Sequence, residues 1–100
     1  MAKFDVYKFG NKSILLLDVQ ADILRDLETR IVIPLRIYSK VPGESQSRLK
    51  PVLNIQGQDY ILLTSELATV LKKDLSNPIC NIEGYHLEIL TALDFLFQGF

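Results

Sequence analysis

The apolar residues in the last part of this chain follow the period of an α-helix, and those in the part before it do not. From Glu83 onward, apolar residues recur every three or four positions, which gives a helix one broad apolar face. The residues on that face are Ile82, His86, Ile89, Leu90, Leu93, Leu96, Phe97 and Phe100. Leu87 and Phe95 fall on the opposite face, so the helix is apolar on more than one side. Such a helix packs on more than one neighbour, and we expect a second copy of the chain to be one of them.

Short segments of strand character precede this helix. They alternate apolar with polar residues or are rich in β-branched residues, and turn-forming residues separate them. The expected elements are strands over 4–9, 13–19, 30–35, 52–55, 60–63 and 68–71, a helical turn over 64–67, and loops over 20–29 and 39–50. Pro34 cannot donate a ladder hydrogen bond, so we expect its strand to lie at a sheet edge or to bend there. The order predicts a mainly β fold that ends in one helix.

Length and charge limit the class of protein. One hundred residues form a single domain, 1–100, with one core. The net charge of −1 argues against direct nucleic-acid binding, which normally needs a basic excess. The longest apolar run, Ile14 to Leu17, is too short for a membrane span, and the first residues lack a signal peptide's apolar core. Cys80 has no second cysteine to pair with, so we expect a cytoplasmic protein.

No pattern of residue types indicates an enzyme. The one histidine, His86, is expected to be packed on the helix rather than catalytic. Cys80 alone makes neither a zinc site nor a redox pair, and the scattered glycines form no phosphate loop. Asp18, Asp22 and Asp26 are spaced by four, but in a strand end and a loop they are weak candidates for paired-carboxylate chemistry. We therefore expect a binding protein without catalysis, cofactor or metal.

The end of the helix has an unbalanced charge. Residues 74–100 contain four acidic residues and no Lys or Arg. Asp94 lies near the negative end of the helix dipole, where like charge costs about 0.3–1 kcal/mol. An acidic, aromatic helix end suits a partner that offers arginine, by ion pairing or by stacking on a Phe ring. The alternative is that solvent screens the charge and no partner is needed.

Four segments together resemble the CcdB toxins. They are Asp18–Leu24 (DVQADIL), Ile31–Leu35 (IVIPL), Pro51–Ile55 (PVLNI) and a helix that ends in Phe97, any residue, Gly99 and an aromatic residue. Their order and spacing match the family over nearly the whole chain. The resemblance implies a homodimer with an SH3-like β-barrel or five-stranded antiparallel sheet, a small β wing and one long C-terminal helix.

The resemblance also implies a function. CcdB-like proteins are non-enzymatic toxins of toxin–antitoxin modules, which bind the dimerisation domain in the A subunit of DNA gyrase and trap the cleaved DNA complex. A cognate antitoxin wraps the toxin dimer with a disordered segment and releases gyrase. Carried over to this chain, the gyrase-binding residues are Ile23, Leu24, Asp94, Phe97, Gln98, Gly99 and Phe100.

Two of these positions depart from the family pattern. Gln98 stands where the best-known members carry tryptophan, and Asp94 stands where they carry asparagine. The tryptophan is expected to stack on a gyrase arginine, and such an anchor supplies about 2 kcal/mol or more. Two alternatives therefore stay open: a homologue that binds only the antitoxin, and a ribonuclease toxin of the same fold.

Overall fold

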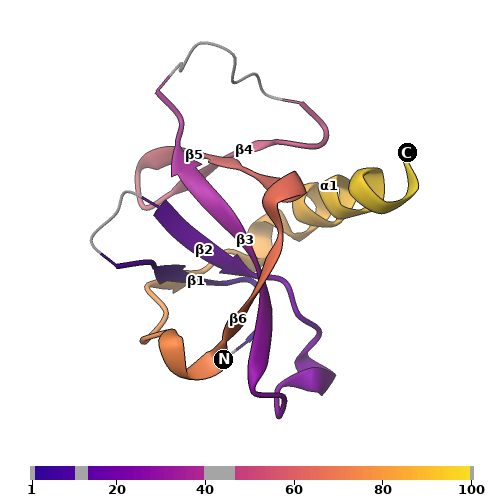
Figure 1. Cartoon of the computed structure of the whole chain (residues 1–100). Helices are drawn as coiled ribbons and strands as arrows, with labels where there is room; N and C mark the ends of the chain where they lie inside the picture. Colours follow the sequence, from indigo (N-terminus) through magenta and orange to yellow (C-terminus); the bar gives the residue numbers. More distant parts are fainter. Residues whose placement is uncertain (1, 11–13, 40–46, 100) are drawn as a thin grey trace.

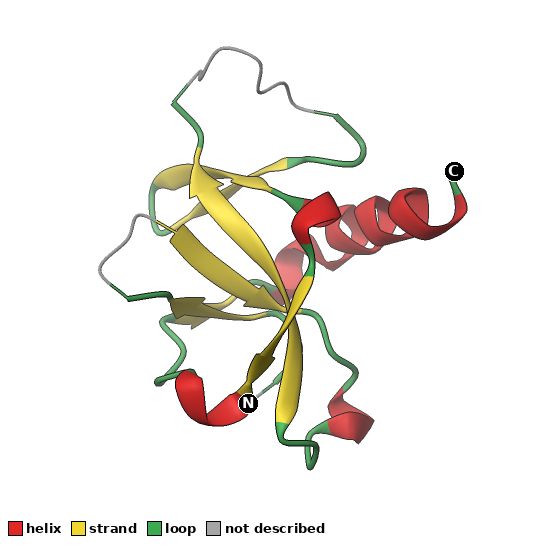
Figure 2. Cartoon of the chain, viewed as in Figure 1, coloured by secondary structure: helices red, strands yellow, loops and turns green. Residues whose placement is uncertain are grey.

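The computed structural model describes residues 2–10, 14–39 and 47–99, and these form one curled antiparallel sheet with a helix on one face (Figure 1). The strands are β1 (Asp5–Lys8), β2 (Ile14–Asp18), β3 (Thr29–Ile37), β4 (Val52–Ile55), β5 (Gln58–Leu62), β6 (Ala68–Leu71) and β7 (Cys80–Asn81). The helix is α1 (His86–Gln98). Four single 3-10 turns complete the fold (Figure 2): η1 (Asp22–Leu24), η2 (Thr64–Glu66), η3 (Lys72–Asp74) and η4 (Glu83–Tyr85). The expected mainly β fold with one C-terminal helix is confirmed.

The long strand β3 organises the sheet. The strand order is β4-β5-β3-β2-β1-β7, and β6 also pairs with β3. On one edge β3 pairs with β2, and on the other its first half pairs with β6 and its second half with β5. Because two different strands share that edge, the sheet curls into a half-barrel instead of lying flat.

Pro34 lies in this central strand, so of the two expected places, a sheet edge or a bend, the sheet edge is wrong. Its carbonyl accepts from Leu63 N at 2.9 Å, on the side where β3 changes partner from β6 to β5. The N and O of one strand residue point the same way, so the nitrogen without a hydrogen also faces this changeover. Proline's lack of an N–H is tolerated there because neither the β3–β6 ladder nor the β3–β5 ladder includes this residue.

One face of the sheet and the helix enclose the core. Leu17, Ile33 and Leu35 from the central strands meet Ile89 and Ala92 of α1, all fully buried. Burying a side chain of this kind stabilises the fold by about 1.5–3 kcal/mol. This packing fixes the direction of α1 and hence the place of its C-terminal end. No helix in the described part of the chain is long and apolar enough to cross a membrane.

Candidate protein-binding surfaces

The predicted site residues fall on two separate surfaces. Ile23 and Leu24 lie on η1, at the purple corner of Figure 1, whereas Asp94, Phe97 and Gln98 lie near the end of α1. The two surfaces occupy different corners of the chain, so one chain does not bring them together. Phe100 lies outside the described residues.

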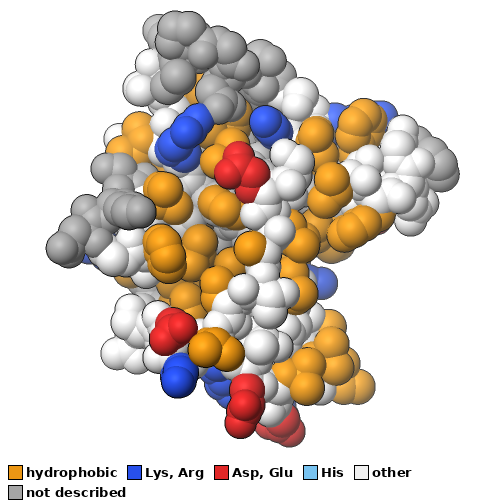
Figure 3. Space-filling view, viewed as in Figure 1, with side chains coloured by type: hydrophobic (Ala, Val, Ile, Leu, Met, Phe, Trp, Pro, Cys, Tyr) orange, Lys and Arg blue, Asp and Glu red, His pale blue; other side chains and the backbone are white. Residues whose placement is uncertain are grey.

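Both surfaces expose large apolar side chains. Ile23 is 90% exposed and Phe97 is 70% exposed, the two highest values among the large hydrophobic residues that the structure describes. In Figure 3 apolar atoms gather at the corner where η1 lies. Single exposed hydrophobics are common on any protein, but residues this exposed at both predicted places favour an interaction role.

The η1 surface is tied down by polar contacts. Gln20 Nε2 donates to the carbonyl oxygen of Leu24 at 2.9 Å, and Gln20 Oε1 accepts from Ile31 N at 3.2 Å. Asp22 Oδ1 accepts from Lys3 N at 2.8 Å. Farther along, Lys72 Nζ donates to the Arg25 carbonyl at 3.0 Å. The loop that was expected over 20–29 is therefore exposed, as predicted, but it is held at several points.

A buried ion pair lies beneath this surface. Arg30 Nε and Nη2 each lie 2.7 Å from Asp18 Oδ2, and both side chains are fully buried. Asp18 Oδ1 also accepts from Gln20 N at 3.0 Å. Beside this pair, burial and then the charges of Asp5 and Asp18 raise the pKa of Tyr7 to about 12. Asp18 is thus a structural residue that joins β2 and β3.

The end of α1 is formed by its glycine. Gly99 has φ of 80°, in the left-handed region, and its N–H donates to the Phe95 carbonyl at 2.9 Å. This is the usual way in which glycine ends a helix, because other residues are strained there. Apart from its chain neighbours, a Cβ at Gly99 would meet no atom of the described residues within 4 Å. Asp94 and Gln98 beside it are exposed.

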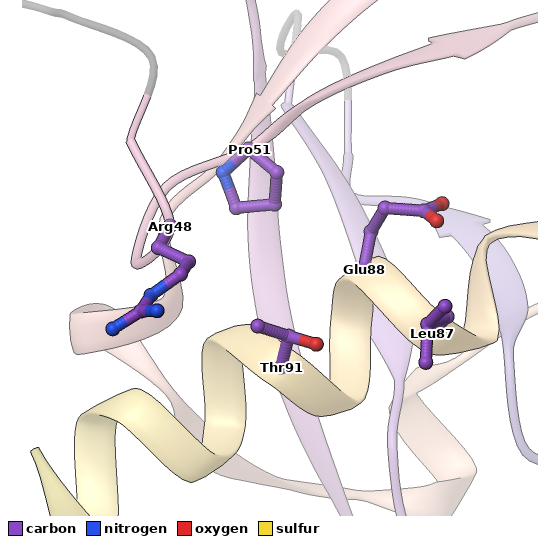
Figure 4. A pocket seen from close by; sticks show the side chains of 5 residues that line it. All are labelled: Arg48, Pro51, Leu87, Glu88 and Thr91. Atoms are coloured by element: carbon purple, nitrogen blue, oxygen red, sulfur yellow. The ribbon is translucent and has the colours of Figure 1, made fainter. Parts of the chain in front are cut away.

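The chain supplies one arginine to its own helix. The Arg48 guanidinium lies over the Phe95 ring, 5.1 Å from the centroid. Arg48 and Pro51 face Leu87, Glu88 and Thr91 of α1 across a shallow groove of about 250 Å³ (Figure 4). Phe95, which the helical pattern left facing solvent, is half-buried under Arg48. An arginine of the same chain therefore stacks on one of the aromatic rings of this helix.

The two remaining candidate residues, His86 and Cys80, differ in exposure. His86 is exposed, and its Nδ1 lies 3.1 Å from the Glu83 carbonyl, so the expectation of a packed histidine is wrong. It is the first residue of α1, and the buried residues of the helix, Ile89 and Ala92, begin one turn later. Cys80 is unpaired and half-buried, and burial and Asp5 raise the pKa of its thiol. In the described part of the chain no cluster of His, Cys, Asp and Glu could hold a metal ion.

Reasoning from the sequence missed Gln20, Arg30 and Arg48. Arg30 carried a usable signal, because it shares the alternation of a strand whose Val32 is buried. Gln20 and Arg48 carried none, since their partners depend on how the turn and the loop fold back.

Comparison with known proteins agrees with this fold. A protein-family model described as CcdB protein matches residues 3–99. Among solved structures, a mycobacterial endoribonuclease in complex with its cognate antitoxin superposes with a TM-score of 0.78. The match covers 97% of this chain and 94% of that chain at 14% sequence identity, so it shows a shared fold.

Proposed function

This chain belongs to the CcdB family, and on that premise we propose that it is the toxin of a toxin–antitoxin module which binds the A subunit of DNA gyrase. It acts in the cytoplasm by binding rather than by catalysis, and it traps the complex in which gyrase has cleaved DNA. A cognate antitoxin, similar in role to the one bound by the structural neighbour, reverses the binding.

The observation that carries this proposal is the exposure of Ile23 and Phe97. The family resemblance assigns both to gyrase, and they are the most exposed large hydrophobic residues of the described chain. Leaving such residues in water has a cost of about 1.5–3 kcal/mol each relative to burial, which a partner recovers. Phe97 also offers a free ring face beside the Asp94 carboxylate, a combination suited to an arginine of the partner.

A homodimer is part of the proposal. Leu90 and Phe97 lie at the edge of the broad apolar face of α1 and Leu87 lies next to that edge, so the three form a stripe that remains exposed in the single chain. A second copy that covers part of this stripe would also supply a second C-terminal end to the same partner. Light scattering at tens of micromolar protein should give the mass of two chains, and a monomer would contradict this part of the proposal.

The departure at Gln98 lowers the expected affinity without removing the site. Gln98 offers hydrogen bonds where the family's tryptophan would stack, so among the described residues Phe97 is the exposed aromatic side chain at this helix end. We therefore expect Phe97→Ala to be the most damaging single truncation, with a loss of about 2 kcal/mol, or roughly thirtyfold in affinity.

The direct experiment mixes the purified protein with gyrase and supercoiled DNA. Detergent should then release linear DNA linked to gyrase. Ile23→Ala and Phe97→Ala should reduce the yield, whereas Phe9→Ala, an exposed aromatic outside both surfaces, should not. The absence of any cleavage complex at micromolar wild-type protein would sink the gyrase proposal.

The fold of the structural neighbour gives a reason to test one other activity. That neighbour is named an endoribonuclease, so cutting of single-stranded RNA by the purified chain should be measured alongside. RNA cleavage would favour a ribonuclease toxin. Tight antitoxin binding without growth arrest would favour a homologue that has lost its poison activity.

A further inference from the structure

The exposed turn over residues 21–28 has no apolar anchor. None of these eight residues is buried, although Ile23, Leu24 and Leu27 are apolar. In Figure 2 the turn stands at the lower right, away from the sheet. Hydrophobic burial therefore cannot be what fixes its shape, and the polar contacts must do so.

Among those contacts, the ones made by Gln20 begin inside the protein. The Gln20 side chain is 5% exposed, and it joins the Leu24 carbonyl to the Ile31 amide. Its own backbone N–H is held by Asp18, which Arg30 holds in turn. The hydrogen bonds thus run without a break from a fully buried ion pair to the carbonyl of Leu24. By contrast, the Asp22 and Lys72 contacts are at the surface, where water competes for the same groups.

We infer that Gln20 is the positioning residue of the partner-binding turn, an inference that rests on the proposed function. Gln20 touches no partner itself, since its side chain is buried. Its side-chain amide donates to the Leu24 carbonyl oxygen, which also accepts from Leu27 N at 3.1 Å. The Gln20 amide thereby fixes both ends of the segment from Leu24 to Leu27. Ile23 is thereby presented in one conformation before binding.

Pre-organisation of this kind changes affinity without changing any contact. A turn that must be ordered during binding loses conformational entropy at that moment. The apparent affinity is then proportional to the fraction of time that the free turn spends in its binding conformation. We expect loss of the Gln20 contacts to weaken gyrase binding about tenfold while the fold stays intact.

Two substitutions separate the contacts. Gln20→Met keeps a similar volume but removes both hydrogen bonds. Gln20→Glu retains the acceptor for Ile31 N and, at neutral pH, lacks the donor for Leu24. Gln58→Glu is the matched control, because Gln58 is exposed on β5. In the described structure its side chain donates only to the neighbouring Asp59 carbonyl. Ile23→Ala removes a contact residue and leaves the Gln20 contacts in place.

The test combines amide hydrogen exchange with affinity for purified gyrase. Gln20→Met should speed exchange at Leu27 and Ile31 about tenfold, and Gln20→Glu should do so at Leu27 but less at Ile31. Both should bind gyrase more weakly while still unfolding cooperatively. Ile23→Ala should weaken binding with unchanged exchange, and Gln58→Glu should change neither.

The outcomes distinguish the inference from the proposed function. Unchanged exchange in Gln20→Met would overturn the inference, as would faster exchange with wild-type affinity for gyrase. A wild-type chain that does not bind gyrase would refute the proposed function instead. The exchange rates would then still show whether Gln20 holds the turn.

Discussion

The buried pair of Asp18 and Arg30 predicts that removing one of the two charges lowers the free energy of unfolding far more than removing both. The Arg30 guanidinium lies 2.7 Å from Asp18, and neither side chain reaches solvent. Arg30→Met leaves the Asp18 carboxylate buried without a countercharge. This costs about 3–5 kcal/mol, a large share of the roughly 5–15 kcal/mol by which a domain is stable.

Removing both charges should restore most of that loss. The double variant Asp18→Asn/Arg30→Met keeps an oxygen for the Gln20 N–H but has no charge to desolvate. Arg30 Nη1 has no hydrogen-bond partner among the described residues, so the native pair is incompletely satisfied. Buried pairs of this kind are often replaced at little cost. We expect the double variant to lie within about 1 kcal/mol of wild type.

Urea unfolding followed by circular dichroism measures these values. Arg25→Met is the control, since Arg25 is exposed and should change the free energy of unfolding by less than about 0.5 kcal/mol. If Arg30→Met costs no more than this control, the pair does not stabilise the fold. If the double variant is as unstable as Arg30→Met, the loss comes from packing and not from an unpaired charge.

Two further predictions concern Gly99 and Tyr7. Gly99→Ala should cost about 1 kcal/mol because of its positive φ, and Gly99→Asn should cost less. If both stay folded and lose gyrase binding, the glycine serves binding; a loss confined to Ala and matching its lower stability would make Gly99 structural. The raised pKa of Tyr7, about 12 against 10.0, means that the unfolded chain loses this proton first as pH rises. Stability should therefore fall between about pH 10 and 12, by at most about 2.7 kcal/mol. Tyr7→Phe should reduce that slope, and an identical slope would contradict the assignment.

The fold was largely predictable because local patterns agree with it. The two hairpins, the 64–67 turn and the final helix all follow from periodicity and turn residues close in sequence. Pro34 and His86 were misjudged for a different reason. Their surroundings depend on where β3 changes partner and on where the buried part of α1 begins, and neither place is marked in the sequence.

The sequence indicated residues for the candidate site but not the contacts that support them. The family resemblance indicated Ile23 and Phe97, and the structure exposes both. The unbalanced charge of residues 74–100 suggested an arginine from a partner, yet Arg48 of the same chain stacks on Phe95. A contact between residues so far apart in sequence leaves no local signal. Of these two rings, Phe97 is therefore the one available to a partner.

Four residues of the segment from Asp18 to Leu24 reverse the usual arrangement of side chains. The polar residues Asp18 and Gln20 are buried and the apolar residues Ile23 and Leu24 are exposed, whereas Val19 packs on the core and Asp22 is exposed in the usual way. Polar groups are costly to bury unless paired, so they are kept here because they hold a turn that has no apolar anchor. Exposed apolar residues gain nothing for the single chain, which supports the proposal that a partner buries them. The segment thus contains both the residue that holds the turn and the proposed contact residue. Substitutions of Gln20 should weaken binding when they remove its hydrogen bonds, and substitutions of Ile23 should weaken binding when they remove apolar surface.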